Sequence, residues 1–323
     1  MELRTGKADA NVLDRSVRRR LGDLMASGSA IGSQALAQDA FRFAMDPVTA
    51  DTRDTAMLAV TAAVNDLAAD GFRPVSLETV ILLPPGTGEK VLRDLVDEIR
   101  TQAEQLKLRV QGGHTEVTDA VTRPVVIAGA YGMPFPEQCG SIPVRPGMAI
   151  VATKWAALEA SFLLAREKRA ELLARFPLEI VRDLELAGQY LGVIRDAQTA
   201  LRDGASLLVN ASEGGIFAAL WELSQKSGLG FSVELSSIPL RQEAIEAFDY
   251  YGQNPYEAES AGMLLAVTPD PDRIIADLAD AGIRAGVIGY LQEGRDKLIL
   301  NGDEKRCLER PAPDSAAAIL HRA

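Results

Sequence analysis

Hydrophobic positions in the first half of the chain follow two different periods. Apolar and alanine residues fill the stretch 56–69 at helical spacing, and a second apolar stripe runs from Val91 to Leu106 behind the capping candidate Thr87. Between them, the β-branched and apolar run Val75–Leu83 predicts a strand that ends at a Pro-Pro-Gly turn. Two further apolar runs predict strands over Leu108–Val110 and Pro124–Tyr131.

The second half repeats this alternation of strands and helices. The apolar runs predict strands over Met148–Thr153, Leu207–Asn210, Phe231–Leu235, Met263–Val267 and Ala285–Tyr290. Helical spacing predicts helices over Ala156–Arg175, Gly215–Gln225, Arg241–Phe248 and Pro271–Ala281. Neither a Gly-x-Gly-x-x-Gly turn nor a Walker-type loop accompanies them, so the pattern predicts an α/β or α+β fold that is neither Rossmann nor P-loop.

A change in composition divides the chain. Proline and glycine concentrate between Met133 and Gly147, which is typical of a boundary between domains. We therefore predict a mobile arm over residues 1–40, a first domain over 41–145 and a second over 146–323. A chain of 323 residues with 47% hydrophobic content is long enough for two ordinary cores.

Charge and cysteine usage narrow the function classes. The chain carries 34 Lys and Arg against 45 Asp and Glu, a net charge of -11, which disfavours nucleic acid and anionic membranes as partners. The basic triplet Arg18–Arg20 is typical of one solvated helix face. No window reaches about 18 uninterrupted apolar residues, and Cys139 and Cys307 form no CxxC pair. We expect an unexported cytoplasmic protein without a membrane span.

Two polar motifs interrupt this apolar pattern. Asn65 and Asp66 lie inside the first helical run, where a buried amide and carboxylate need hydrogen-bond partners or a cation. A polar pair that binds a neighbouring loop explains them equally well. Gly112-Gly113-His114 with Glu116 then follows a short apolar run and predicts a strand that enters an open turn, where backbone amides can approach an anion.

These motifs, with Ser212-Glu213-Gly214-Gly215-Ile216 downstream, resemble the aminoimidazole ribonucleotide (AIR) synthetase superfamily. The resemblance is strongest to its HypE-like, AIR synthase-related branch, through Asp46-Pro47-Val48-Thr49, Gly112–Thr118 and Thr153-Lys154-Trp155. It implies an α+β two-domain fold, in which the first domain's sheet joins a second subunit in a dimeric barrel and a C-terminal αβ domain packs behind it. It also implies a homodimer that binds ATP with Mg²⁺.

The same resemblance implies the site residues. Metal ligands are expected at Asp46, Asp66 and Glu116, and catalysis at His114 or Asp66. His114 is equally well explained as a hydrogen-bonded turn residue, and Trp155 is a further candidate for ligand contact. The nucleotide contacts implied by the resemblance are Asn65, Asp66, Gly112, Gly113, His114, Lys154, Ser212, Glu213, Gly214 and Gly215.

Three departures from the family pattern weaken the case for catalysis. An acidic segment that ligates Mg²⁺ in relatives corresponds here to Gly32–Leu36, without its carboxylates. The common His-Asp pair before Ser212 is replaced by Asn210-Ala211. Leu320–Ala323 stand where HypE has a tail that ends in cysteine, so HypE's own chemistry is not expected.

Two hypotheses follow. The first is an ATP-dependent phosphotransferase that acts on a small metabolite or a carboxamide. The second is a catalytically degenerate relative that acts as a ligand-binding or maturation-partner homodimer. Convergence of Asp39, Asp46, Asp66 and Glu116 in one cleft would favour metal chemistry and hence the first.

Overall fold

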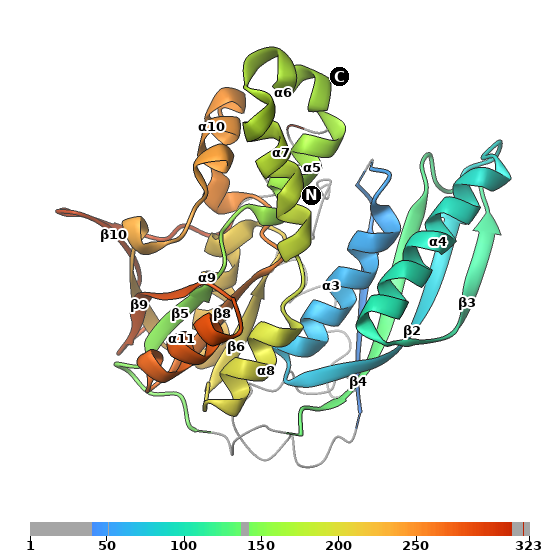
Figure 1. The fold of residues 1–323 in the computed structure, drawn as a ribbon. Helices are drawn as coiled ribbons and strands as arrows, with labels where there is room; N and C mark the ends of the chain where they lie inside the picture. Colours follow the sequence, from blue (N-terminus) through green and yellow to red (C-terminus); the bar gives the residue numbers. More distant parts are fainter. Residues whose placement is uncertain (1–40, 51, 137–141, 312–318, 320–323) are drawn as a thin grey trace, which may run out of the picture.

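The computed structural model describes residues 41–50, 52–136, 142–311 and 319. The expected arm, Asp39, the segment 32–36, Cys139 and the tail 320–323 lie outside these residues. The described chain forms two sheets with helices packed against them, side by side (Figure 1). The predicted α+β two-domain fold is confirmed.

The first sheet has four strands in the order β1-β4-β2-β3. Its strands are β1 Arg42–Val48, β2 Phe72–Leu83, β3 Arg109–Val117 and β4 Val125–Pro134. β3 runs parallel to β2, and the other neighbours are antiparallel. The helices α3 Thr55–Ala69 and α4 Glu89–Leu106 cover one face of this sheet and bury a core of alanine, valine and leucine between them and the strands (Figure 1).

The other face of this sheet carries no helix among the described residues. Phe43, Met45 and Met133 are 43%, 55% and 42% exposed there. Phe43 packs on Tyr131 of the neighbouring strand, with ring centroids 4.8 Å apart. These exposed aromatic and methionine side chains make this face of the sheet more apolar than a solvent-exposed sheet face needs to be.

The second sheet has seven strands in the order β11-β10-β7-β9-β5-β8-β6. Every residue of β5, β8 and β6, the three strands at one end of the sheet, is buried, so both faces of this end are covered. Its strands are β5 Ala149–Thr153, β6 Leu207–Ala211, β7 Gly230–Glu234, β8 Met263–Thr268, β9 Ala285–Gln292, β10 Lys297–Asn301 and β11 Glu304–Cys307.

Two groups of helices pack on this second sheet. α8 Ile194–Arg202 and α11 Pro271–Asp280 contact each other and the central strands, whereas α9 Gly215–Ser227 packs against β6. A separate layer stands above them (Figure 1). This layer consists of α5 Leu158–Glu167, α6 Arg169–Arg175, α7 Leu178–Leu186 and α10 Gln242–Tyr251. Three short 3₁₀ helices connect elements of the second part: η3 Ala187–Tyr190, η4 Leu235–Ser237 and η5 Pro255–Glu257.

The structure corrects several predicted elements. The turn expected at Gly112-Gly113 is wrong, because β3 continues through both glycines to Val117. A Cβ at Gly113 would lie 2.1 Å from the backbone oxygen of Thr79, so this glycine allows β3 to approach β2 closely. The helix expected over 156–175 is two helices, α5 and α6. The strands β1, β10 and β11 and the helices α7 and α8 were not predicted.

Candidate functional site

The C-terminal half of α3 forms the junction between the two parts of the chain. α3 contacts α8 and β6 of the second part, and Asn65 is fully buried there. Asn65 Nδ2 donates to the Leu191 carbonyl at 2.7 Å, and its Oδ1 accepts from the Val193 amide at 2.9 Å. Both polar atoms of Asn65 therefore bind a loop of the second part, which is the hydrogen-bonding alternative that the sequence left open.

Asp66 points to a different partner. Asn210 in β6 donates from Nδ2 to Asp66 Oδ1 at 3.2 Å. Asn210 is only 8% exposed, and its Oδ1 has no hydrogen-bond partner among the described residues. Because an unpaired buried carbonyl oxygen costs free energy, this atom marks a place where a donor or a cation would fit.

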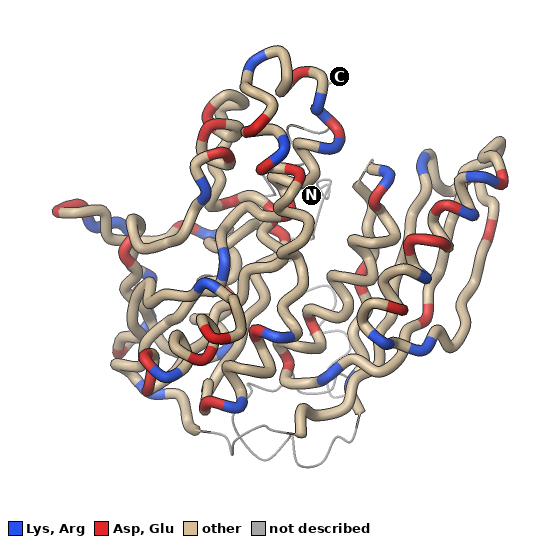
Figure 2. Tube along the Cα trace, in the orientation of Figure 1, with Lys and Arg blue, Asp and Glu red and all other residues tan. Residues whose placement is uncertain are grey.

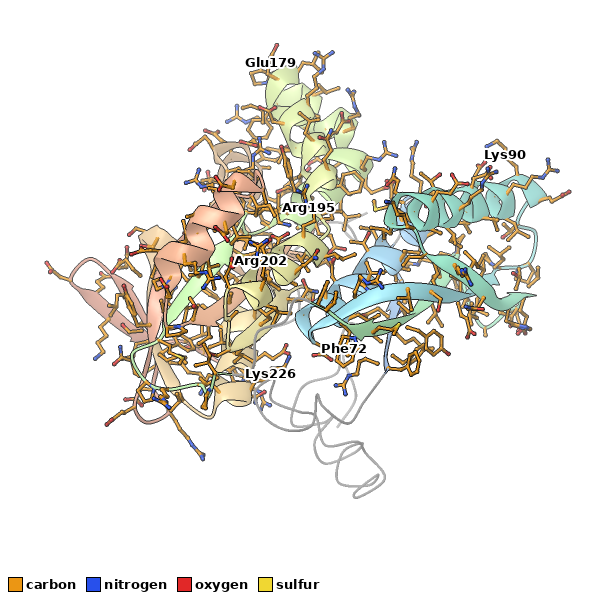
Figure 3. The ribbon with its side chains drawn as sticks, turned by 60° about the horizontal axis from the view of Figure 1, so that its bottom comes forward. Phe72, Lys90, Glu179, Arg195, Arg202 and Lys226 are labelled. Carbon is orange, nitrogen blue, oxygen red and sulfur yellow. The ribbon has the colours of Figure 1, made fainter. Side chains whose placement is uncertain are left out.

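Charged residues of three elements lie near this end of α3. Asp70, one helical turn after Asp66, pairs with Arg42 of β1 at 3.2 Å. Lys226 in the last turn of α9 pairs with Glu222 at 2.8 Å. Burial opposes the charge on Lys226, but Glu222, Asp70 and Asp66 outweigh it and raise the pKa of the ammonium. Figure 3 labels Lys226 in α9 and Phe72 at the start of β2, on the two sides of the junction.

The turn at 212–215 follows β6 directly and leads into α9. Gly214 and Gly215 have φ angles of +74° and +65°, a conformation that favours glycine. A Cβ at Gly215 would lie 2.5 Å from the Tyr256 carbonyl oxygen, so the turn packs tightly on the segment 256–258. Phe217 in the first turn of α9 stacks on Tyr256 with centroids 5.4 Å apart. The predicted strand-to-helix turn with Ser212 and Glu213 is therefore present beside Asn210.

His114 lies away from this junction on the edge strand β3. Its Nε2 is 3.3 Å from Glu116 Oε2, and both side chains are more than half exposed. A groove of about 470 Å³ runs between β3 and α4, lined by Gly112, Gly113 and His114 on one side and by Val96 and Arg100 on the other. α4 carries acidic and basic residues along its outer surface (Figure 2).

The sheet separates the three predicted metal ligands. Asp46 pairs with Ala128, which pairs with Thr79, which pairs with Gly113, so these four residues share a face. His114 and Glu116 occupy the opposite face, because they alternate with Gly113. The described residues contain no group of three His, Cys, Asp or Glu side chains placed to hold a metal ion. Asp46, Asp66 and Glu116 therefore do not converge within one chain.

Comparison with known families decides the assignment of the fold. The N-terminal domain of AIR synthase related proteins matches residues 30–133, and the corresponding C-terminal domain matches residues 145–301. The chain belongs to the AIR synthase related family. The two matched ranges contain the first sheet up to Met133 and the second sheet up to Asn301, respectively.

Relatives of this AIR synthase related protein include hydrogenase maturation proteins. The carbamoyl dehydratase HypE of Rhodobacter capsulatus is 28% identical over 240 residues, which cover 72% of this chain and 67% of the relative. The structure of E. coli HypE superposes with a TM-score of 0.73 at 20% identity and covers 94% and 96% of the two chains. A HypE structure in complex with ATP superposes with a TM-score of 0.72 at 19% identity, with 98% of both chains covered.

Lys154 of this AIR synthase related protein forms a buried ion pair. Its Nζ lies 3.0 Å from Asp196 and donates to the Gly192 carbonyl at 2.6 Å. Asp196 also accepts from the Thr153 hydroxyl at 2.6 Å. Burial lowers the pKa of the ammonium, and Asp196 works against that effect. The structure thus places Lys154 inside the second domain, at 5% exposure, and its predicted nucleotide contact stays a prediction.

Trp155 packs close to this ion pair. Its ring meets Tyr190 edge-on, with centroids 5.4 Å apart, and the Arg241 guanidinium lies 5.2 Å from its centroid. Met57 of α3 belongs to the same apolar cluster. The predicted ligand contact at Trp155 stays a prediction, and the observed contacts are those of a packed aromatic residue.

Sequence reasoning missed three charged residues at the junction. Arg42 pairs with Asp70 at the end of α3, and Lys226 lies in the last turn of α9, but neither the motifs nor the periodicity singled them out. The one available signal is the spacing of Asp66 and Asp70, because residues four apart share a face of a helix. Arg42 and Lys226 come from β1 and α9, which are separated by 184 positions, and no local pattern connects them.

Proposed function

We propose that this AIR synthase related protein binds ATP at the junction of its two domains. The observation that carries the proposal is the contact between Asp66 and Asn210, which joins the two motifs of the resemblance in space. Asn210 precedes the glycine turn at 212–215, where the backbone can approach an anion and α9 begins. The HypE–ATP complex shares the fold and supports the assignment.

The activity we propose is phosphotransfer from ATP to a small metabolite or a carboxamide. The name of the Rhodobacter capsulatus relative, carbamoyl dehydratase, describes an enzyme that acts on a carbamoyl group. One observation favours the second hypothesis, a catalytically degenerate protein that binds ligand as a maturation partner. The junction presents Asn210 beside Asp66, followed by Ala211, where the resemblance implies a titratable His-Asp pair.

A protein-bound Mg²⁺ does not fit the described residues. Asp66 accepts a hydrogen bond from an amide, Asp46 and Glu116 lie on opposite faces of the sheet, and Asp70 is paired with Arg42. Mg²⁺ therefore enters the proposal with the nucleotide, as the counter-ion of its phosphates. No step of the proposed activity is assigned to an ion held by this chain.

We propose a homodimer through the open face of the first sheet. Phe43, Met45 and Met133 expose a contiguous apolar surface there, and β3 leaves its outer edge unpaired within the described chain. A second copy presents the same surface, which suits a two-fold interface. Phe43→Glu should convert the dimer to a monomer in light scattering. A dimer that persists in this variant would refute the interface.

Thermal unfolding with and without ATP tests nucleotide binding. At an ATP concentration of 100 times the dissociation constant, the folded state should gain about 2.7 kcal/mol. Asp66→Ala should abolish the shift, whereas Asp94→Ala, which removes an exposed carboxylate of α4, should retain it. No shift at millimolar ATP would refute the proposal. ATP turnover that disappears in Asp66→Ala would favour phosphotransfer over the degenerate alternative.

A further inference from the structure

Lys154 has a backbone conformation that favours glycine. Its φ angle is +55°, directly after β5 ends at Thr153. Any side chain costs conformational energy there, so a lysine keeps this conformation only where its surroundings impose it. The Lys154 amide donates to the Arg284 carbonyl at 2.7 Å, and the ammonium is held by buried acceptors. The contacts of the side chain are therefore part of what fixes this turn.

The Lys154 ammonium binds the start of α8. It donates to the Gly192 carbonyl at 2.6 Å and to Asp196 Oδ2 at 3.0 Å. Gly192 belongs to the loop 191–193, and Asp196, which is 2% exposed, lies in the first turn of the helix that follows this loop. A carboxylate also suits the partial positive charge of a helix N-terminus. One lysine thus fixes the loop and the helix start relative to each other.

The same loop receives Asn65 from the first domain. Asn65 donates to the Leu191 carbonyl and accepts from the Val193 amide. The carbonyl between these two groups, that of Gly192, is the one that Lys154 binds. Three consecutive residues therefore bind two side chains that come from different domains. Lys154 holds the loop in the shape that Asn65 requires.

A second route of contacts leads from Thr153 to Asp66. The Thr153 hydroxyl donates to Asp196 Oδ1 at 2.6 Å and accepts from the Leu264 amide at 3.1 Å. Leu264 in β8 is the ladder partner of Asn210 in β6, and Asn210 donates to Asp66. Both routes begin in adjacent residues at the end of β5 and finish in adjacent residues of α3.

We propose that Thr153, Lys154 and Asp196 are positioning residues, which hold the second domain in the shape that receives Asn65 and Asp66. Lys154 then acts on ATP binding through this network and not by contact with the nucleotide. The effect on ATP rests on the proposed nucleotide site, whereas the effect on the docking of the two domains does not.

Hydrogen exchange at the Val193 amide tests the docking without ATP. The main variant is Lys154→Met with Asp196→Leu, which removes the ion pair without leaving a single buried charge. Exchange at Val193 should become at least about tenfold faster, because the loop can open locally, whereas amides of β7, which lies outside both routes, should change by less than about threefold. Gly192→Ala is the matched control. A Cβ there would meet no described atom within 4 Å and the carbonyl remains, so its exchange should match the wild type.

Two results would overturn the proposal. Equal acceleration at Val193 and in β7 would mean that the ion pair stabilises the second domain as a whole. Unchanged exchange at Val193 would mean that the loop does not need Lys154.

Two substitutions at Thr153 repeat the test if circular dichroism shows that the ion-pair variant is unfolded. Thr153→Val keeps the shape of the side chain and removes the hydroxyl, and Thr153→Ser keeps the hydroxyl. Only Thr153→Val should accelerate exchange at Val193 relative to β7. The same exchange in both variants would contradict the role of the hydroxyl and hence the proposal.

A double-mutant cycle on ATP affinity separates positioning from direct contact. The ion-pair variant should weaken ATP binding by about tenfold, but by about threefold or less when Asn65→Ala has already cut the route through the loop. Equal weakening in both backgrounds would overturn the inference and identify Lys154 as a nucleotide contact. Absence of ATP binding by the wild type would refute the proposed function, and exchange at Val193 would still decide the docking role.

Discussion

The two adjacent glycines of β3 should respond very differently to the same small substitution. A Cβ at Gly113 would lie 2.1 Å from the Thr79 carbonyl oxygen and 3.1 Å from its carbonyl carbon. A Cβ at Gly112 would meet no described atom within 4 Å. Gly112→Ala and Gly113→Ala therefore form a matched pair within one motif, and only the second should disturb the sheet.

The size of the effect follows from the distance. Carbon and oxygen atoms in adjacent strands normally approach to about 3.3–3.6 Å, so Gly113→Ala requires a displacement of about 1.2 Å or more. Thr79 is the direct partner of Gly113 in the parallel ladder, and a displacement of that size breaks the hydrogen bonds on either side. Two lost bonds at about 1 kcal/mol each, with added strain, give a loss of about 2–3 kcal/mol.

Chemical denaturation and hydrogen exchange check this prediction. Gly113→Ala should lower the free energy of unfolding and the exchange protection of β3, because an edge strand can separate without unfolding of the core. Gly112→Ala should stay within about 0.5 kcal/mol of the wild type. Equal stability of the two variants would refute the close-approach argument. Loss of ATP binding in both, without loss of stability, would instead identify the glycine pair as a nucleotide contact.

Three further predictions concern buried polar groups. Asn65→Ala should cost about 2–4 kcal/mol in denaturant unfolding, because it leaves a buried amide and a buried carbonyl without their partner; a loss below 1 kcal/mol would contradict this role. Lys154→Met should lower the free energy of unfolding by about 3–5 kcal/mol, because it leaves the buried carboxylate of Asp196 without its cation. The double variant Lys154→Met with Asp196→Leu should recover part of that loss. Burial raises the pKa of Glu98, whose carboxylate accepts from the Met57 amide, to about 7 from 4.5. The folded protein then holds a proton that the unfolded chain loses, so stability should fall as the pH rises from 4.5 to 7, by about 1 kcal/mol after allowance for the half-exposed side chain. Glu98→Gln should remove that slope and should be the more stable protein at pH 8, and an unchanged slope in pH-dependent unfolding would contradict it.

Elements with a strong apolar pattern were predictable from the sequence, and β3 shows why others were not. The predicted helix at 56–69 and strand at 148–153 agree with α3 and β5 to within a residue, because buried faces impose a period on the sequence. All nine residues of β3 are exposed, so no alternation of apolar and polar residues indicates how far the strand extends beyond Val110. The length of β3 is set by its pairing with β2, whose residues lie more than thirty positions earlier in the chain.

The candidate site was predictable to a similar degree. The sequence singled out Asn65 and Asp66 as a pair, but successive helix residues point about 100° apart. Asn65 consequently reaches the loop at 191–193, whereas Asp66 reaches Asn210. Local pattern identifies which side chains need a partner. Only the packing of one domain on the other determines which partner each side chain finds.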